Sequence, residues 1–233
     1  MDNTPYPITK YKNRSIIIEK ESYQSLSNFV IPKQYKKYLD QVVIPHGLVI
    51  DRIEKLANDI VSDYFDKTVT LLIVLNGAIH YGTHLAHKIA DALKNDSDDL
   101  KTMKIFTEFI TAKSYQDEKS TGDVFIQFDE KLENKLRNKH IIVVEDTFDS
   151  GKTLTKLVSY LRTLNPISLK TTVLVQKMNP LNLQYDFEIN YIGFLVPDQY
   201  VIGFGFDFNG NFRYLDHVCT FLEKEVEELR VKK

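Results

Sequence analysis

The chain has 233 residues, a length that allows one or two domains. With 43% hydrophobic and 27% charged residues, it has the composition of an ordinary globular protein. The net charge of −2, with lysine and arginine spread along the chain, argues against a general nucleic-acid or membrane-surface binder, and the single Cys219 excludes a disulfide framework.

The first elements in chain order are predicted by apolar patterning. Residues 1–13 are polar and lack an apolar secretory core, and no apolar run approaches the roughly 20 residues that span a bilayer, so we expect a cytoplasmic location. An apolar stripe over residues 48–65 predicts a helix. The β-branched run VTLLIVL at 69–75 predicts a buried strand, which residues 76–78 break before a second helix.

The remaining elements continue the alternation of strands and helices. Residues 112–123 are polar and are expected to form a mobile loop. Further helices are expected at 152–164 and 223–231, and the second helix runs to about residue 93. The expected strands lie at 15–19, 69–75, 104–110, 124–128, 140–144, 171–177, 191–195 and 201–206. This order implies right-handed crossovers and a mostly parallel sheet.

The most informative segment is VVEDTFDSGKT at 143–153. An apolar run is followed by Glu145 and Asp146, then by Asp149 and a small-residue turn that opens onto a helix. Ligands of α/β proteins bind at the carboxyl ends of strands, and a helix N-terminus suits a phosphate. Because carboxylates repel phosphate unless a sugar or metal ion lies between, the segment indicates a phosphorylated ribose with Mg²⁺.

Two other interpretations of this segment remain open. A P-loop, GxxxxGK[ST], shares the GKT ending, but its first glycine would fall on Asp146. The segment could also be an ordinary strand–loop–helix connection capped by Asp149 or Ser150. That interpretation leaves three acids within five residues unexplained.

The segment resembles the diphosphoribose-binding signature of type I phosphoribosyltransferases. Residues 44–60, 113–123 and 196–219 are similar, in order and spacing, to stretches of the hypoxanthine-guanine enzymes of that family, and the resemblance runs from about 29 to 218. It implies an α/β fold with a mostly parallel sheet flanked by helices and a small hood. We expect one domain over 1–233, with a core at about 45–195. The hood would comprise 14–44 and 196–220, with 1–13 and 221–233 peripheral.

The resemblance assigns the ribose phosphate to the central segment. Glu145 and Asp146 would bind the ribose hydroxyls directly or through Mg²⁺. The 5′-phosphate would be held by the small-residue turn, which comprises Ser150, Gly151, Lys152 and Thr153. Asp149 would be the general base that accepts a proton from the purine imidazole ring.

The purine would be bound by later segments. Lys177 would donate to the exocyclic O6, Tyr200 would stack on the ring, and Val201 would present its backbone to the base edge. Lys177 could instead be a surface lysine, with Gln176 as a possible misalignment, and Tyr200 could be a core residue.

The pyrophosphate side would use three further elements. Asp207 would help to hold a second Mg²⁺, and Arg213 would bind pyrophosphate. The loop Leu75, Asn76 and Gly77 would bind pyrophosphate too, and we expect the Leu75–Asn76 peptide bond to be cis or to switch. A lid would be formed by Lys113, Ser114 and Tyr115.

Departures from the family pattern gather around pyrophosphate. Asn76, Thr111 and Gln199 stand where related enzymes commonly carry lysine, arginine and lysine, and about two extra residues occur near 179–182. We expect an enzyme that makes IMP or GMP from a purine base and phosphoribosyl pyrophosphate. A nucleotide-binding regulatory relative with little turnover is the alternative. Related enzymes form homodimers or homotetramers, so self-association is expected.

Overall fold

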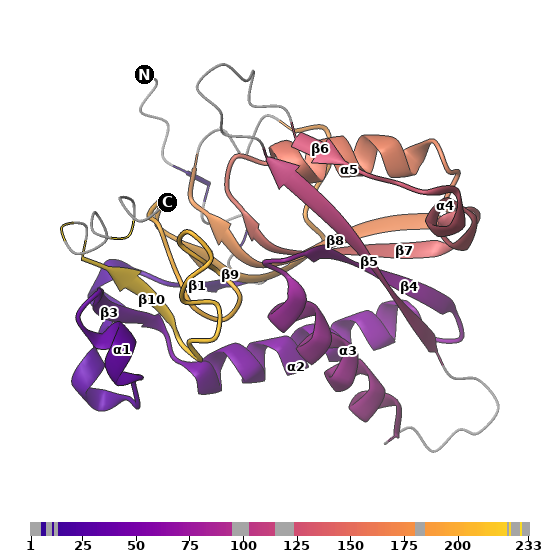
Figure 1. Ribbon diagram of the computed structural model, residues 1–233. Coiled ribbons are helices and arrows are strands. Elements are labelled where there is room, and N and C mark those ends of the chain that lie inside the picture. Colours follow the sequence, from indigo (N-terminus) through magenta and orange to yellow (C-terminus); the bar gives the residue numbers. More distant parts are fainter. Residues whose placement is uncertain are drawn as a thin grey trace.

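The computed structural model describes residues 6–7, 11, 14–94, 103–114, 124–179, 185–222, 224 and 229. Within them, a seven-stranded sheet forms the centre of the molecule and a three-stranded sheet lies beside it (Figure 1). The larger sheet runs in the order β1 (Ile16–Ile17), β9 (Tyr191–Val196), β8 (Ser168–Lys177), β7 (His140–Phe148), β4 (Thr68–Leu75), β5 (Lys104–Ser114) and β6 (Val124–Ile126). All its pairings are parallel except that of β5 with β6, which confirms the mostly parallel sheet.

The direction of winding reverses at the middle of this sheet. From β4 the chain passes through α3 (Ile79–Lys94) to β5 on one side. From β7 it passes through α5 (Lys152–Arg162) to β8 on the other side. The carboxyl ends of β4 and β7 therefore border a topological switch point, where α/β proteins bind their ligands.

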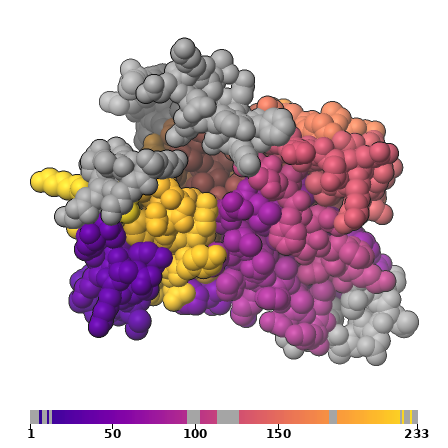
Figure 2. Space-filling model, viewed as in Figure 1, coloured from indigo at the N-terminus to yellow at the C-terminus, as the bar shows by residue number. Residues whose placement is uncertain are grey.

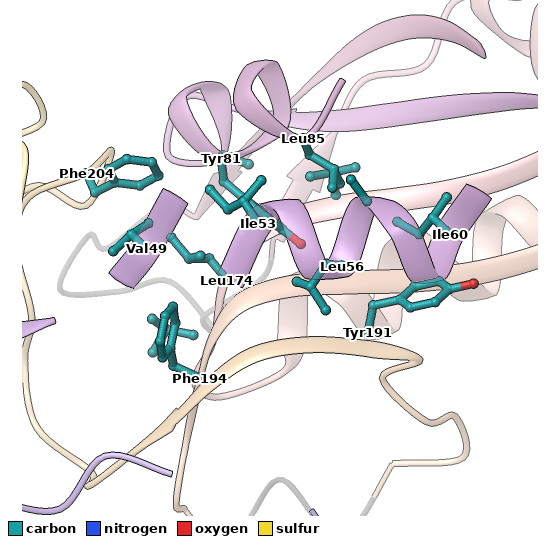
Figure 3. Packing of buried hydrophobic residues seen from close by; sticks show 14 of the residues in the cluster. Val49, Ile53, Leu56, Ile60, Tyr81, Leu85, Leu174, Tyr191, Phe194 and Phe204 are labelled. Carbon is teal, nitrogen blue, oxygen red and sulfur yellow. The ribbon is translucent and has the colours of Figure 1, made fainter. Parts of the chain in front are cut away.

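Helices cover both faces of the large sheet (Figure 1). One face packs against α2 (His46–Asp63) and α3, and Figure 3 shows Ile53, Leu56 and Ile60 of α2 lying against that face. The other face packs against α5 and α4 (Glu130–Leu136). Each fully buried aliphatic side chain contributes roughly 1.5–3 kcal/mol to folding.

The smaller sheet has the antiparallel order β10 (Val218–Phe221), β3 (Leu39–Ile44) and β2 (Gln24–Ser25). Short helices α1 (Lys33–Lys36), η2 (Lys20–Ser22) and η3 (Leu26–Asn28) lie in the same N-terminal region. Its own apolar cluster includes Phe208, Phe212 and Cys219. Burial raises the pKa of the Cys219 thiol to about 12, so this cysteine is a packing residue.

Most predicted elements are confirmed, but two predictions are wrong. Residues 201–206 form a turn instead of a strand, because Gly203, Phe204 and Gly205 have φ angles of 92°, 50° and 101°. The loop expected from 112 is wrong at its first residues, since 112–114 extend β5 and pair with β6. Residues 115–123 and nearly all of the expected helix at 223–231 lie outside the described residues.

The sequence patterns also missed several elements. Neither α4 nor the strands β3 and β10 were expected from periodicity. The segment containing Ile16 and Ile17, expected within the hood, pairs with β9 at the edge of the large sheet. None of the helices in the described part of the chain is long and apolar enough to span a membrane.

Candidate active site

Three segments meet at the switch point between β4 and β7. The Leu75–Asn76 peptide bond that follows β4 is cis, as expected. A Cβ at Gly77 would collide with the carboxylate of Asp146, and a Cβ at Gly205 would collide with the Gly77 carbonyl. Figure 2 shows the C-terminal segment packed directly against the region that contains α3. The loop after β4, the acids of β7 and the 203–206 turn therefore form one continuous wall.

Gly77→Ala is expected to disrupt this wall. The added methyl group would push the Asp146 carboxylate aside, and overpacking of this kind typically costs about 1–3 kcal/mol. Urea unfolding measures the loss of stability. Gly47→Ala is the matched control, because Gly47 lies in α2 with open space around it and a helical alanine should stabilise slightly. Equal stability of Gly77→Ala and the native protein would contradict the close approach.

Glu145 and Asp146 form a buried pair near the carboxyl end of β7. Each is 9% exposed, and the negative charge of Asp146 adds to the effect of burial on Glu145. Burial raises the pKa of both carboxyls, well above its usual value for Glu145, while the charge of Arg213 partly offsets the rise for Asp146. Asp146 Oδ1 also accepts from the Thr147 amide at 2.7 Å.

This acidic pair could bind a hydroxyl group or a cation that comes with a ligand. Glu145 Oε2 is buried and has no hydrogen-bond partner among the described residues, a costly state unless a hydroxyl or cation approaches it. No group of three potential metal-binding side chains occurs in the described part of the chain. Mg²⁺ is usually held by one or two carboxylates together with substrate oxygens and water, so the pair fits that ion.

The turn between β7 and α5 lacks a side-chain cap. Gly151 occupies the N-cap of α5 with φ of 69°, and no side-chain cap hydrogen bond occurs there among the described residues. The capping interpretation of Asp149 and Ser150 is therefore wrong. A cavity of about 120 Å³ is lined by Glu145, Thr147, Phe148, Asp149, Ser150, Gly151, Lys152, Thr153 and Leu154. Uncapped amides that border a small cavity suit a phosphate group.

The geometry also disfavours the P-loop interpretation. Asp146, at the position of the first P-loop glycine, lies within β7. The turn that precedes α5 begins only after Phe148. It is too short to surround a triphosphate.

Asp149 and Lys177 are joined directly. Lys177 Nζ lies 2.6 Å from Asp149 Oδ2, and the side chains are 10% and 45% exposed, respectively. Lys177 is thus a buried residue rather than a surface lysine. Its Nζ lies 5.8 Å from the centroid of the Tyr200 ring. Gln176 is directed elsewhere, because its Nε2 donates to the Tyr6 hydroxyl at 2.5 Å.

A second cavity of about 170 Å³ adjoins this ion pair. Tyr200 is 49% exposed, which excludes the core interpretation of this residue, whereas Val201 is buried. The cavity is lined by Asp146, Thr147, Asp149, Lys177, Tyr200, Val201, Phe206 and Asp207. Asp149 and Thr147 border both cavities, so a ligand that fills both would span the turn.

Asp207 and Arg213 lie on the turn that follows Tyr200. Arg213 pairs with Asp207 Oδ1 at 2.7 Å and donates to the Gly205 carbonyl at 2.6 Å. The Tyr200 hydroxyl donates to the Asp207 carbonyl at 2.7 Å. Arg213 therefore brings a positive charge to the wall built from 75–77 and 203–206.

The positions that depart from the family pattern bring no positive charge. Asn76 is exposed beside the cis peptide bond, and Thr111 is exposed on β5. Gln199 Nε2 donates to the Tyr23 hydroxyl. The backbone of Lys113 and Ser114 lies at the end of β5, opposite β6, whereas their side chains and Tyr115 fall outside the described part of the chain.

Two residues that line the 170 Å³ cavity, Thr147 and Phe206, were not anticipated. Thr147 lies between Glu145 and Asp149, and alternation along the strand end would have placed the three on one side. Phe206 belongs to the turn that was expected to be a strand. No local signal could have identified it.

Comparison with known proteins agrees with this geometry. A family model described as a phosphoribosyl transferase domain matches residues 43–206. The human hypoxanthine-guanine phosphoribosyltransferase is 36% identical over 208 residues, which cover 89% of this chain and 93% of that protein. The rat protein of the same name is 34% identical over equal coverage.

Two solved structures share the fold. The hypoxanthine-guanine phosphoribosyltransferase of Schistosoma mansoni in complex with IMP has a TM-score of 0.74 and 27% identity. The match covers 92% of this chain and 98% of that one. The protein of the same name from Bacillus anthracis has a TM-score of 0.66 and 26% identity, over 79% of this chain and 99% of that one. This chain therefore belongs to the phosphoribosyltransferase family.

Proposed function

We propose that the protein transfers phosphoribose from 5-phospho-α-D-ribose 1-diphosphate to hypoxanthine or guanine, giving IMP or GMP and pyrophosphate. The observation that carries the proposal is the Asp149–Lys177 ion pair, which lines the 170 Å³ cavity. The uncapped turn at 150–153 lines the neighbouring 120 Å³ cavity. A nucleoside monophosphate has a base and a phosphate at its two ends. The relatives named above support the same chemistry.

The ribose phosphate would lie across the turn after β7. The amides and hydroxyls of 150–153 would bind the 5′-phosphate, with Lys152 at the exposed rim. Glu145 and Asp146 would bind the ribose 2′- and 3′-hydroxyls or a Mg²⁺ ion coordinated to them. Such an ion would neutralise the charge of the leaving pyrophosphate. The unpaired Glu145 Oε2 supports this assignment.

The purine would replace the direct contact between Asp149 and Lys177 with contacts of its own to both side chains. A 6-oxopurine offers the O6 acceptor next to N7 on one edge, so Lys177 would donate to O6 while Asp149 accepts the proton that the imidazole ring loses. Adenine would instead turn an amino group toward the ammonium. Tyr200, with half its surface exposed at the cavity, would stack on the ring, and Val201 would contact the base edge.

Pyrophosphate would leave along the part of the wall that is formed by residues 75–77. Arg213 and the backbone of Leu75, Asn76 and Gly77 would bind it, and Asp207 would help to hold a second Mg²⁺. Arg213 would then leave its pair with Asp207. A lid that contains Lys113, Ser114 and Tyr115 would exclude water from the reacting ribose.

The proposal also includes the domain organisation, the location and the assembly of the protein. The whole chain, 1–233, would form one domain with a core at about 45–195 and a hood from about 14–44 and 196–220, except that β1 pairs with the large sheet. The protein would be cytoplasmic and would form a homodimer or homotetramer. Gel filtration with light scattering would detect a monomer and so exclude that assembly.

The function is tested by mixing the protein, Mg²⁺, phosphoribosyl pyrophosphate and hypoxanthine, and following IMP by absorbance. We expect turnover with hypoxanthine or guanine and little with adenine. If GMP raises the melting temperature while neither base gives product, the protein is a regulatory relative instead.

A further inference from the structure

We infer that Tyr185 is a positioning residue that aims the amides of the phosphate turn into their cavity. This inference rests on the proposed function of that turn. The Tyr185 hydroxyl donates to the Ser150 carbonyl, and its ring lies against Gly151. Tyr185 is not among the residues that line the 120 Å³ cavity, so it acts from outside the site.

The effect on the amides follows from peptide geometry. In a trans peptide unit, the carbonyl and the N–H of the next residue point in opposite directions. The Ser150–Gly151 unit is trans, and its carbonyl is held by Tyr185. The Gly151 amide therefore points away from Tyr185, and Gly151 lines the cavity whereas Tyr185 does not. Rotation of this unit would exchange the amide for a carbonyl oxygen, which repels phosphate.

The ring of Tyr185 is itself held in place. Its centroid lies 5.5 Å from that of Phe148 and 5.9 Å from that of Phe187. Phe148 is buried at the end of β7, directly before the turn. Beyond the turn, the Gly151 carbonyl accepts from both the amide and the hydroxyl of Thr155 at 2.9 Å. The turn is thus fixed at both ends, and Tyr185 fixes the peptide unit between them.

The ring also explains why residue 151 is glycine. A Cβ at this position would collide with the Tyr185 ring, and φ of 69° disfavours any other residue. The close approach of ring and backbone leaves no room for the peptide unit to rotate. Without the hydroxyl, the ring would still exclude water from the turn but would no longer hold the carbonyl.

Tyr185→Phe tests this role because it keeps the ring and removes the hydrogen bond. We expect KM for phosphoribosyl pyrophosphate and the dissociation constant for GMP to rise about three- to tenfold, the range for one lost hydrogen bond. KM for guanine and the saturated kcat should change less than twofold, since the base site is untouched. A merely structural role would lower stability without this selective effect on phosphate ligands.

Tyr160→Phe is the matched control. Tyr160 lies on α5 and donates to Glu133, away from both cavities, so its loss should leave both KM values unchanged. If native protein and Tyr185→Phe bind GMP equally well, or if the KM values for base and phosphoribosyl pyrophosphate rise together, the inference is wrong. Failure of the native protein to bind GMP would overturn the proposed function itself, and the inference with it.

Discussion

Asp149→Asn is expected to lower kcat for IMP synthesis by about 10²–10⁴-fold, the usual contribution of a general base. The amide has nearly the same shape as the carboxylate but cannot accept the proton that the purine imidazole loses. Asp149 is placed for this role because it borders both the cavity with Tyr200 and Lys177 and the cavity of the phosphate turn. Steady-state assays at saturating Mg²⁺ and phosphoribosyl pyrophosphate measure the change.

Binding separates a chemical role of Asp149 from a structural one. The variant should bind GMP with nearly native affinity in calorimetry, because GMP no longer carries the reacting proton. Loss of the partly exposed ion pair with Lys177 should cost about 1 kcal/mol or less. Asp91→Asn, which breaks the exposed pair with Lys94 on α3, should leave kcat unchanged. A native kcat in Asp149→Asn would remove this residue from the mechanism.

The parts of the site that the sequence predicted well depend on local signals. The apolar run before Glu145, the small residues after Asp149 and the apolar face of α5 lie within about 20 consecutive residues. A strand, a turn and a helix N-terminus follow from such a pattern without knowledge of the remaining chain. The end of the strand at Leu75 is likewise predicted by its immediate neighbours in the sequence.

The contact between Asp149 and Lys177 depends instead on strand register. Phe148 pairs with Gln176 across β7 and β8, so the next residue of each strand reaches the same edge of the sheet. These residues are 28 positions apart, and periodicity contains no information on that register. The burial of Lys177, which excludes a surface role, follows only from the assembled sheet.

The strand predicted at 201–206 is absent for a different reason. Its large apolar residues recur at every second position from Ile202, the period of a strand. Positive φ angles at three consecutive residues instead fold it into a turn, in which Gly203 and Phe206 exchange backbone hydrogen bonds of 3.0 and 3.1 Å. The turn is needed because Gly205 must approach the Gly77 carbonyl, and Arg213 must reach the Gly205 carbonyl. Such contacts arise only between segments that are distant in sequence.

Lys177→Met is expected to lower kcat/KM for guanine and hypoxanthine by about 10²-fold or more, because a site built around a hydrogen bond to its substrate discriminates strongly. Methionine is unbranched and fills the volume left by the lysine stem. Asp149 loses a partner but remains solvated, since its side chain is 45% exposed. The change should therefore act on base recognition more than on stability, and kcat/KM for each base measures it.

The decisive quantity is the ratio of kcat/KM between guanine and adenine. It should fall sharply in Lys177→Met, through the loss of guanine activity and without a large gain for adenine. Lys170→Met is the matched control, because Lys170 lies on the same strand β8 and pairs with Asp63 at 2.7 Å, outside both cavities. That variant should lose some stability and keep the native ratio. If Lys177→Met also keeps the native ratio, the ammonium does not recognise O6, and selection of the base must come from the backbone of Val201 and the walls of the cavity.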